Sequence, residues 1–351
     1  MSTACLAQQI ERLKKMIASA PTLEVESKPE SEIETDPAIA VEPNRNGPTA
    51  RDEECENLYL TGRPALKQFL RFVRSEAVNP PGEGTLADEW KAANDYIRDL
   101  EKGEAGMADD PPIGKLGREF ESLLIEFLKN PLVRHGFNTV PTEVAIVELD
   151  RLVVYQKHID LTFVRQLQRR LGPAPSEEDI FRTCLPAEHR TPPVKWSQVH
   201  RDKFVIMSPS NDLRFLGTMT LRPEHIRDYP PPGNLAGVIG LALGFSSNFL
   251  NAIYAEKRLI LNNGSHRAYA LREMGITHVP CIVEHVSSRE ELDVVASSEV
   301  RRNPDLYLKH ARPSMLKDYF NPKLRKVMPV HRRLLQLTVK FEVEEANVPA
   351  L

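Results

Sequence analysis

The stretch from Leu259 to Val283 constrains the fold of this chain more than any other part of the sequence. It reads as an aliphatic strand, a tight turn at Gly264, a helix that ends near Gly275, and a second aliphatic strand from Val279 to Val283. Glycine at 264 can adopt backbone angles that are closed to other residues, and glycine is the usual residue just after a helix. A strand, a turn, a helix and a return strand in so short a stretch predict one compact α/β unit.

The turn in this unit has the chemistry of an anion site. Ser265 is a good N-cap residue, and a helix that starts there leaves main-chain N–H groups unpaired in its first turn. Those groups and the helix dipole favour a bound anion. An arginine fork beside them matches pairs of phosphate oxygens. The chain is therefore expected to bind a phosphate or nucleotide through Asn263, Gly264, Ser265, His266 and Arg267.

A second polar stretch, Gly244 to Asn248, places small donors directly before a predicted hairpin that leads into the same turn. Ser247 and Asn248 are therefore added to the expected phosphate-binding residues.

This segment resembles the ParB-like/sulfiredoxin superfamily, which has a G-x-H-R or related turn between a strand and a helix, then a glycine and a V-P-hydrophobic strand. The matching residues are Gly264-Ser265-His266-Arg267, Gly275 and Val279-Pro280-Cys281-Ile282-Val283, and Val144 to Leu152 is placed as the opening strand. Members of this largely bacterial-type family include CTP-binding DNA-segregation clamps, nucleases, a free-serine kinase and sulfiredoxin. The resemblance implies a nucleotide at the turn (CTP, ATP or ADP, with Mg) more firmly than it implies a reaction.

Two departures narrow what the resemblance implies. Sulfiredoxin has its catalytic cysteine directly before the His-Arg pair, and this chain has Ser265 there. Because a serine supplies no thiolate at neutral pH, sulfiredoxin activity is excluded. A ParB-type helix-turn-helix signature after residue 285 is also missing, which argues against a segregation clamp.

The mixture of predicted strands and helices indicates an α+β protein. The expected organisation is a ParB/sulfiredoxin-like mixed-sheet domain preceded by a small helical block and a disordered acidic linker. The segments are a short amphipathic helix at 1–19, the linker at 20–56, the helical block at 57–138, the ParB/sulfiredoxin-like domain at 140–290 and a basic helical segment at 291–351.

Several elements within these segments are predicted from periodicity and breakers. Helices are expected after Pro64, from Thr85 as N-cap, and over 116–128, and a further helix over 160–171 is closed by Gly172. Strands are expected over 144–154 and 204–207. A hairpin with its turn at Glu256-Lys257 and a buried strand pair within 235–254 complete the list.

Charge is distributed unevenly along the chain. The formal net charge is −3, so any contact with nucleic acid must come from a local patch. Residues 301 to 333 are such a stretch, in which Tyr307, Tyr319 and Phe320 could stack on bases between cations. The expected nucleic-acid-binding residues are Arg301, Arg302, Lys309, Arg312, Lys323, Arg325 and Lys326.

Other sequence features limit the class of protein to which this chain can belong. The four cysteines, Cys5, Cys55, Cys184 and Cys281, form no C-x-x-C pair, so no metal site is predicted and free thiols are expected. Polar residues interrupt any signal-peptide core and no membrane span is expected, which predicts a cytoplasmic protein. Residues 5–19 carry an apolar stripe that suits docking to a protein partner.

Three functions remain open on these grounds. The first is a ParB-like nucleotide- or nucleic-acid-binding protein, acting as a regulator or a nuclease. The second is a small-molecule phosphotransferase like the family's serine kinase, which needs a carboxylate base near the turn, with Glu148, Asp150 or Asp212 as candidates. The third is a non-enzymatic adaptor or assembly subunit that docks through its N-terminal helix.

Overall fold

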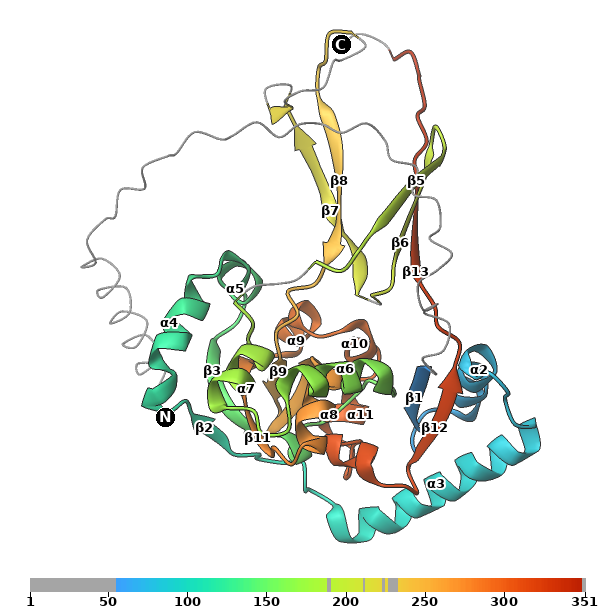
Figure 1. Cartoon of the computed structure of the whole chain (residues 1–351), viewed down its shortest axis with the longest axis vertical. Coiled ribbons are helices and arrows are strands. Elements are labelled where there is room, and N and C mark those ends of the chain that lie inside the picture. The colour runs from blue at the N-terminus through green and yellow to red at the C-terminus, as the bar shows by residue number, and fades with distance from the viewer. Residues whose placement is uncertain (1–54, 188–190, 211, 223–224, 227–232, 349–351) are drawn as a thin grey trace. The chain divides into compact units, whose positions relative to one another are not determined.

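A computed structural model describes residues 55–348 except 188–190, 211, 223–224 and 227–232 (Figure 1). The helix expected at 1–19 and nearly all of the linker expected at 20–56 lie outside the described residues. Within the described part, helices and mixed sheets alternate along the chain, which confirms the α+β class.

The central element is a five-stranded mixed sheet with the order β10-β9-β11-β3-β2. Its strands are β10 (Arg258–Asn263), β9 (Asn251–Ala255), β11 (His278–His285), β3 (Thr142–Glu148) and β2 (Ile113–Lys115). The pair β9–β11 is parallel and the other neighbours are antiparallel. The expected opening strand at 144–152 is β3, followed by a short 3-10 helix at Leu149–Arg151.

The strand–turn–helix–strand unit predicted from the sequence is present. β10 ends at Asn263, Gly264 takes a left-handed φ of 97°, and α8 (Ser265–Glu273) follows at once. Gly275, with φ 87°, lies just after that helix, and β11 returns antiparallel to β3. The hairpin before the turn is also confirmed: β9 and β10 are joined by Glu256 and Lys257, with φ 45° and 71°, the left-handed pair that a tight two-residue hairpin requires.

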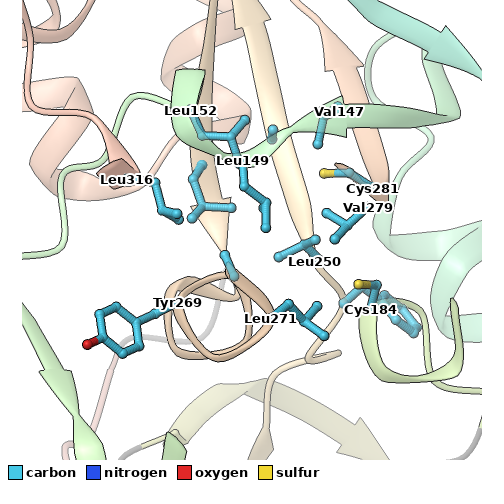
Figure 2. Packing of buried hydrophobic residues seen from close by; sticks show 14 of the residues in the cluster. Val147, Leu149, Leu152, Cys184, Leu250, Tyr269, Leu271, Val279, Cys281 and Leu316 are labelled. Carbon is cyan, nitrogen blue, oxygen red and sulfur yellow. The ribbon is translucent and has the colours of Figure 1, made fainter. Parts of the chain in front are cut away.

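Alternating side chains of this hairpin enter two different hydrophobic clusters. Leu259 and Leu261 belong to a cluster that also contains residues of α6 (Leu161–Leu171), α7 (Glu177–Cys184) and α8. Ile260 belongs to a second cluster with α9 (Arg289–Val295), α10 (Ser298–Arg302) and α11 (Pro304–Leu308). Because successive residues of a strand point to opposite faces, the two clusters cover opposite faces of the sheet. Figure 2 shows the first cluster, where Leu250 and Leu271 lie close to Cys184.

The segment predicted as a helical block is helical only in part. It contains α2 (Leu66–Glu76), α3 (Glu83–Glu104), α4 (Glu121–Lys129) and α5 (Pro131–Gly136), but begins with the strand β1 (Cys55–Leu60) and includes β2. The helix α3 starts after Gly82, so Thr85 is not its N-cap, and α4 begins later than expected. Because β2 pairs with β3, the block and the following segment share one sheet.

The strand β1 lies in a three-stranded sheet of order β12-β1-β4, formed with β12 (Arg325–Val330) and β4 (His158–Asp160). A third cluster, with Tyr59, Phe69, Leu86 and Met328 among its members, packs α2 and α3 against it. Helix α6 follows β4 and ends at Gly172, as the sequence predicts.

Two small sheets complete the described part. One has the order β13-β6-β5, with β13 (Leu335–Lys340), β6 (Lys203–Ser208) and β5 (Lys195–His200), and the other pairs β7 (Leu213–Leu221) with β8 (Val238–Phe245). The expected buried strand pair at 235–254 is therefore wrong, because β8 and β9 lie in different sheets and β8 is partly exposed. The C-terminal segment expected to be helical ends in strands β12 and β13. No described helix is both long and apolar enough to cross a membrane.

Candidate functional site at the start of helix α8

The turn at Gly264 is tightly packed on one side. A Cβ placed on this glycine would lie 2.5 Å from Cδ1 and 3.3 Å from Cα of Leu250. The left-handed backbone and this close approach both require glycine, as the sequence predicts. The loop that precedes β9 therefore covers this face of the turn, and any ligand must approach from the face that carries the first residues of α8.

The side chain of Arg267 differs from the expectation that it points outward as a phosphate donor. It is only 6% exposed. Its Nη1 atom donates to the carbonyl oxygens of Thr183 and Cys184, both at 3.1 Å, and its Nη2 atom donates to Oδ1 of Asn248 at 3.0 Å. Burial lowers its pKa to about 10, which still leaves the guanidinium charged at neutral pH. Through these hydrogen bonds, Arg267 links α8 to the end of α7 and to the loop before β9.

The loop before β9 reaches the turn, as expected from the sequence. Asn248, with φ 49°, accepts the hydrogen bond from Arg267. The next polar contact in this loop is made by Asp212, whose Oδ2 atom accepts from the N–H of Ser246 at 2.9 Å and from its hydroxyl at 2.6 Å. Ser247 is half-buried between them. The structure therefore brings Asn248 to Arg267 directly and Ser247 to the same loop.

The first turn of α8 keeps main-chain donors unpaired. The first helical hydrogen bond runs from the N–H of Ala268 to the carbonyl oxygen of Gly264, at 2.9 Å. No acceptor among the described residues is recorded for the N–H groups of Ser265, His266 and Arg267. These three groups lie at the positive end of the helix dipole, so they can receive an anion. Asn263, the last residue of β10, is half-buried beside them.

His266 adds a side chain with an unmet hydrogen bond. Its Nε2 atom is buried and has no partner among the described residues. Its ring makes edge contacts with the rings of Phe163, at a centroid distance of 5.7 Å, and His158, at 6.5 Å. Burial, and then the nearby charge of His158, lowers the pKa of His266 to about 4, so the ring is neutral at neutral pH. A buried polar atom without a partner is uncommon, and it marks a place where a ligand atom or a water would be stabilised.

His158 is a residue that the sequence analysis did not select. It is the first residue of β4, and its ring also approaches that of Phe72, at a centroid distance of 5.3 Å. Burial lowers its pKa, while Glu76 and Asp160 oppose that change. Its place beside His266 follows from β4 and α8 lying next to each other, which no local sequence pattern signals.

The three carboxylates considered as bases fall in different places. Asp150 makes a paired ion bridge to Arg272, at 2.8 and 2.9 Å, and this bridge lies at the end of α8 away from the turn. Glu148 is at the end of β3. Only Asp212, through its contacts with Ser246, touches the loop that reaches the turn. Among the described residues, no group of three or more potential ligands could hold a metal ion.

The C-terminal residues expected to bind nucleic acid do not form the free basic face that the sequence predicts. Arg312 is 1% exposed, and its guanidinium is paired with Asp318 and Glu104. Lys326 pairs with Glu89 at 2.8 Å, and Arg325 donates to the carbonyl of Tyr319 at 3.0 Å. Arg312 is therefore a structural residue and not a surface cation.

The remaining cations of this set are exposed but have partners. Arg302 pairs with Glu299 at 3.2 Å, Lys309 with Asp305 at 3.4 Å, and Arg301 donates to the carbonyl of Asp293. Lys323 lies 4.6 Å from the centre of the Tyr96 ring. Tyr307 and Tyr319, which were expected to stack on bases, are buried. Nucleic acid would have to displace several surface ion pairs to use this segment.

A more open basic surface lies on α2. A groove of about 760 Å³ is lined by the exposed cations Lys67, Arg71 and Arg74, with Leu66, Leu70, Ser75 and Glu83 completing its wall. Arg74 and Glu83 form an ion pair across it. The sequence analysis did not select this surface, because cations spaced along a helix are also typical of an ordinary solvated face.

Comparisons with known proteins add no relative. No family model, no curated protein and no solved structure matches the chain.

Proposed function

We propose that this chain is a ParB-like nucleotide- or nucleic-acid-binding protein that holds a phosphate group at the start of helix α8. One observation carries the proposal: the main-chain N–H groups of Ser265, His266 and Arg267 and the Nε2 atom of His266 share one helix start, and none of them has a hydrogen-bond partner in the described part of the chain. A phosphate has enough acceptor oxygens to meet all of these donors, and the helix dipole favours its charge.

The roles within this site differ from those that the resemblance alone implies. Main-chain N–H groups and the neutral imidazole of His266 would contact the phosphate. Arg267 would not, because its guanidinium is committed to the carbonyls of Thr183 and Cys184 and to Asn248. It would instead hold the turn in the shape that binds the phosphate. Such a site explains binding without requiring a reaction, so a regulatory role fits it more simply than catalysis.

A second candidate, phosphate transfer to a small molecule, rests on Asp212. This is the one candidate carboxylate that contacts the loop reaching the turn. The assay that separates the two is transfer of phosphate from ATP or ADP to free amino acids, with Asp212→Asn as the variant. Binding without transfer favours the first proposal.

The direct test is calorimetric titration of the full chain with CTP, ATP and ADP, each with and without Mg²⁺. The variant is His266→Gln, which removes the imidazole but keeps a polar side chain. The matched control is His135→Gln, because His135 is an exposed histidine on α5. We expect binding of at least one nucleotide, weakened about tenfold by His266→Gln and unchanged in the control, as the loss of one hydrogen bond to a charged group predicts. Failure of all three nucleotides to bind, or equal binding by both variants, would contradict the proposal.

A further inference from the structure

Three cations form a row along one side of helix α2. Lys67, Arg71 and Arg74 are spaced by four and then three residues, so they share one side of the helix and span about 10 Å along its axis. All three side chains are exposed, and they line the groove of about 760 Å³ that also reaches Glu83, the first residue of α3 (Figure 1). The helix therefore presents a straight row of positive charge along an open groove.

A second segment, residues 331–333, brings more positive charge to the last turn of α2. The N–H of His331 donates to the carbonyl oxygen of Glu76 at 3.2 Å, and Arg333 pairs with the carboxylate of the same residue, also at 3.2 Å. Arg332 lies between these two contacts and is exposed. Arg332 and Arg333 thus extend the basic surface beyond the end of the helix.

This surface has more cations than carboxylates to pair with them. Glu83 pairs with Arg74, and Glu76 pairs with Arg333. The exposed cations without an ion pair to any described residue are Lys67, Arg71 and Arg332. In the C-terminal stretch, by contrast, exposed cations are paired with nearby carboxylates. Because the formal net charge of the chain is −3, the excess of positive charge on α2 is local, and it favours an anionic partner.

We propose that the groove on α2 binds the phosphate backbone of double-stranded nucleic acid without reading its sequence. Each strand of a duplex carries a phosphate about every 3.4 Å along the axis, so a row of cations about 10 Å long can face several successive phosphates. Arginine can donate two parallel hydrogen bonds to one phosphate, which suits Arg71 and Arg74. This site extends the nucleic-acid part of the proposed function to a second surface, and it requires no ligand at the start of α8.

The walls of the groove favour a nucleic-acid backbone over other polyanions. The apolar residues that line it are Leu66, which is half-buried, and Leu70, which is only 8% exposed. They offer little apolar surface to anchor a peptide or to insert into a membrane. The residues that line the groove include no aromatic side chain on which a base could stack, which favours a duplex over a single strand. Contacts to phosphates alone carry no sequence information.

The test measures binding of the full chain to a short fluorescent DNA duplex by anisotropy, over a range of salt concentrations. The variant is Arg71→Gln, and the matched control is Arg170→Gln, because Arg170 is an exposed arginine on α6 that also lacks a partner among the described residues. Loss of one phosphate contact should weaken binding about tenfold at about 0.1 M salt and should reduce the slope of log affinity against log salt by about one. The control should bind as the wild type does.

Competition experiments separate a duplex from the other polyanions. An unlabelled duplex of unrelated sequence should compete fully, whereas a single strand, poly-glutamate and vesicles of phosphatidylserine should compete more weakly at equal charge. Stronger competition by poly-glutamate or by the vesicles would overturn the proposal. So would the absence of duplex binding, or the same affinity and salt dependence in Arg71→Gln and the control. Duplex binding that is lost in His266→Gln but kept in Arg71→Gln would also overturn it, while supporting a phosphate site at the start of α8.

Discussion

The Nη1 atom of Arg267 donates to the carbonyl oxygen of Cys184 at 3.1 Å, which ties the first turn of α8 to the last residue of α7. A residue that reads as a surface phosphate donor in the sequence thus lies in the interior. The same guanidinium holds Asn248, so three segments far apart in the sequence meet at one side chain.

Arg267→Ala should destabilise the fold rather than only weaken ligand binding. The change removes the hydrogen bonds of the buried guanidinium to the carbonyls of Thr183 and Cys184 and to Asn248, and we expect the free energy of unfolding to fall by about 2–4 kcal/mol. Urea denaturation measures this, with Arg301→Ala as the exposed control, for which we expect a change within about 0.5 kcal/mol. Equal stability of the two variants would mean that the hydrogen bonds of Arg267 do not stabilise the fold.

Two glycines with similar backbone angles should respond differently to alanine. At Gly264 a Cβ would lie 2.5 Å from Leu250, whereas at Gly275 nothing lies within 4 Å of that position. Gly275→Ala should cost about 1 kcal/mol from backbone strain alone. Gly264→Ala adds the clash, and we expect a total loss of about 2–3 kcal/mol in the same measurement. Equal losses at the two positions would show that Leu250 moves aside freely.

Acid should weaken the fold through His266. Its pKa in the folded protein is lowered to about 4, below the value of about 6.5 in an unfolded chain. Between about pH 4 and pH 6.5 the unfolded state therefore binds more protons than the folded state, so the folded protein loses stability as the pH falls from about 6.5 toward 4. A pKa shift of this size corresponds to about 3 kcal/mol of unfolding free energy. Because the ring is only partly shielded from solvent, we expect a loss of about 2 kcal/mol.

The variant His266→Phe should lose this pH dependence while remaining folded at neutral pH. Unfolding by urea at pH 7, 6 and 5 measures the slope for both proteins. The same slope in the variant and the wild type would assign the acid sensitivity to other groups, of which His158 is the nearest.

Glu284 should have the opposite pH dependence. It is 4% exposed, and burial raises its pKa to about 7. Its protonated form is the stable one, so its contribution is present at low pH and is lost as the pH rises from about 4.5 through 7. Glu284→Gln should therefore be more stable than the wild type at pH 8, by about 2 kcal/mol, and similar to it at pH 5. A destabilised variant at pH 8 would mean that the carboxylate has a partner that favours its charge.

The parts of the fold that the sequence predicts well are those set by local signals. Glycines at 264 and 275 and the pair Glu256-Lys257 mark turns whose backbone angles few residues adopt, and the hairpin, α8 and β11 follow from them. Helix α6 was predicted for the same reason, because Gly172 ends it.

The parts that the sequence does not predict depend on contacts between distant segments. β1 reads as the start of a helical block, and it is a strand because β12 and β4 pair with it from far along the chain. The burial of Arg312 depends on Asp318 and Glu104, and the cation pattern of that segment alone suggested an open surface. In the candidate site, the turn itself was predictable, whereas the inward direction of Arg267 and the neighbour His158 depend on tertiary packing.

The most direct test of the central claim follows the main-chain amides of α8 by ¹H–¹⁵N NMR while CTP, ATP or ADP is added to the full chain. If a phosphate is bound at this helix start, the amide resonances of Ser265, His266 and Arg267 should shift together and saturate with the added nucleotide, and those of Arg272 should shift least within the helix. Saturable shifts that leave these three amides unchanged, or that map to another surface such as the α2 groove, would contradict the account.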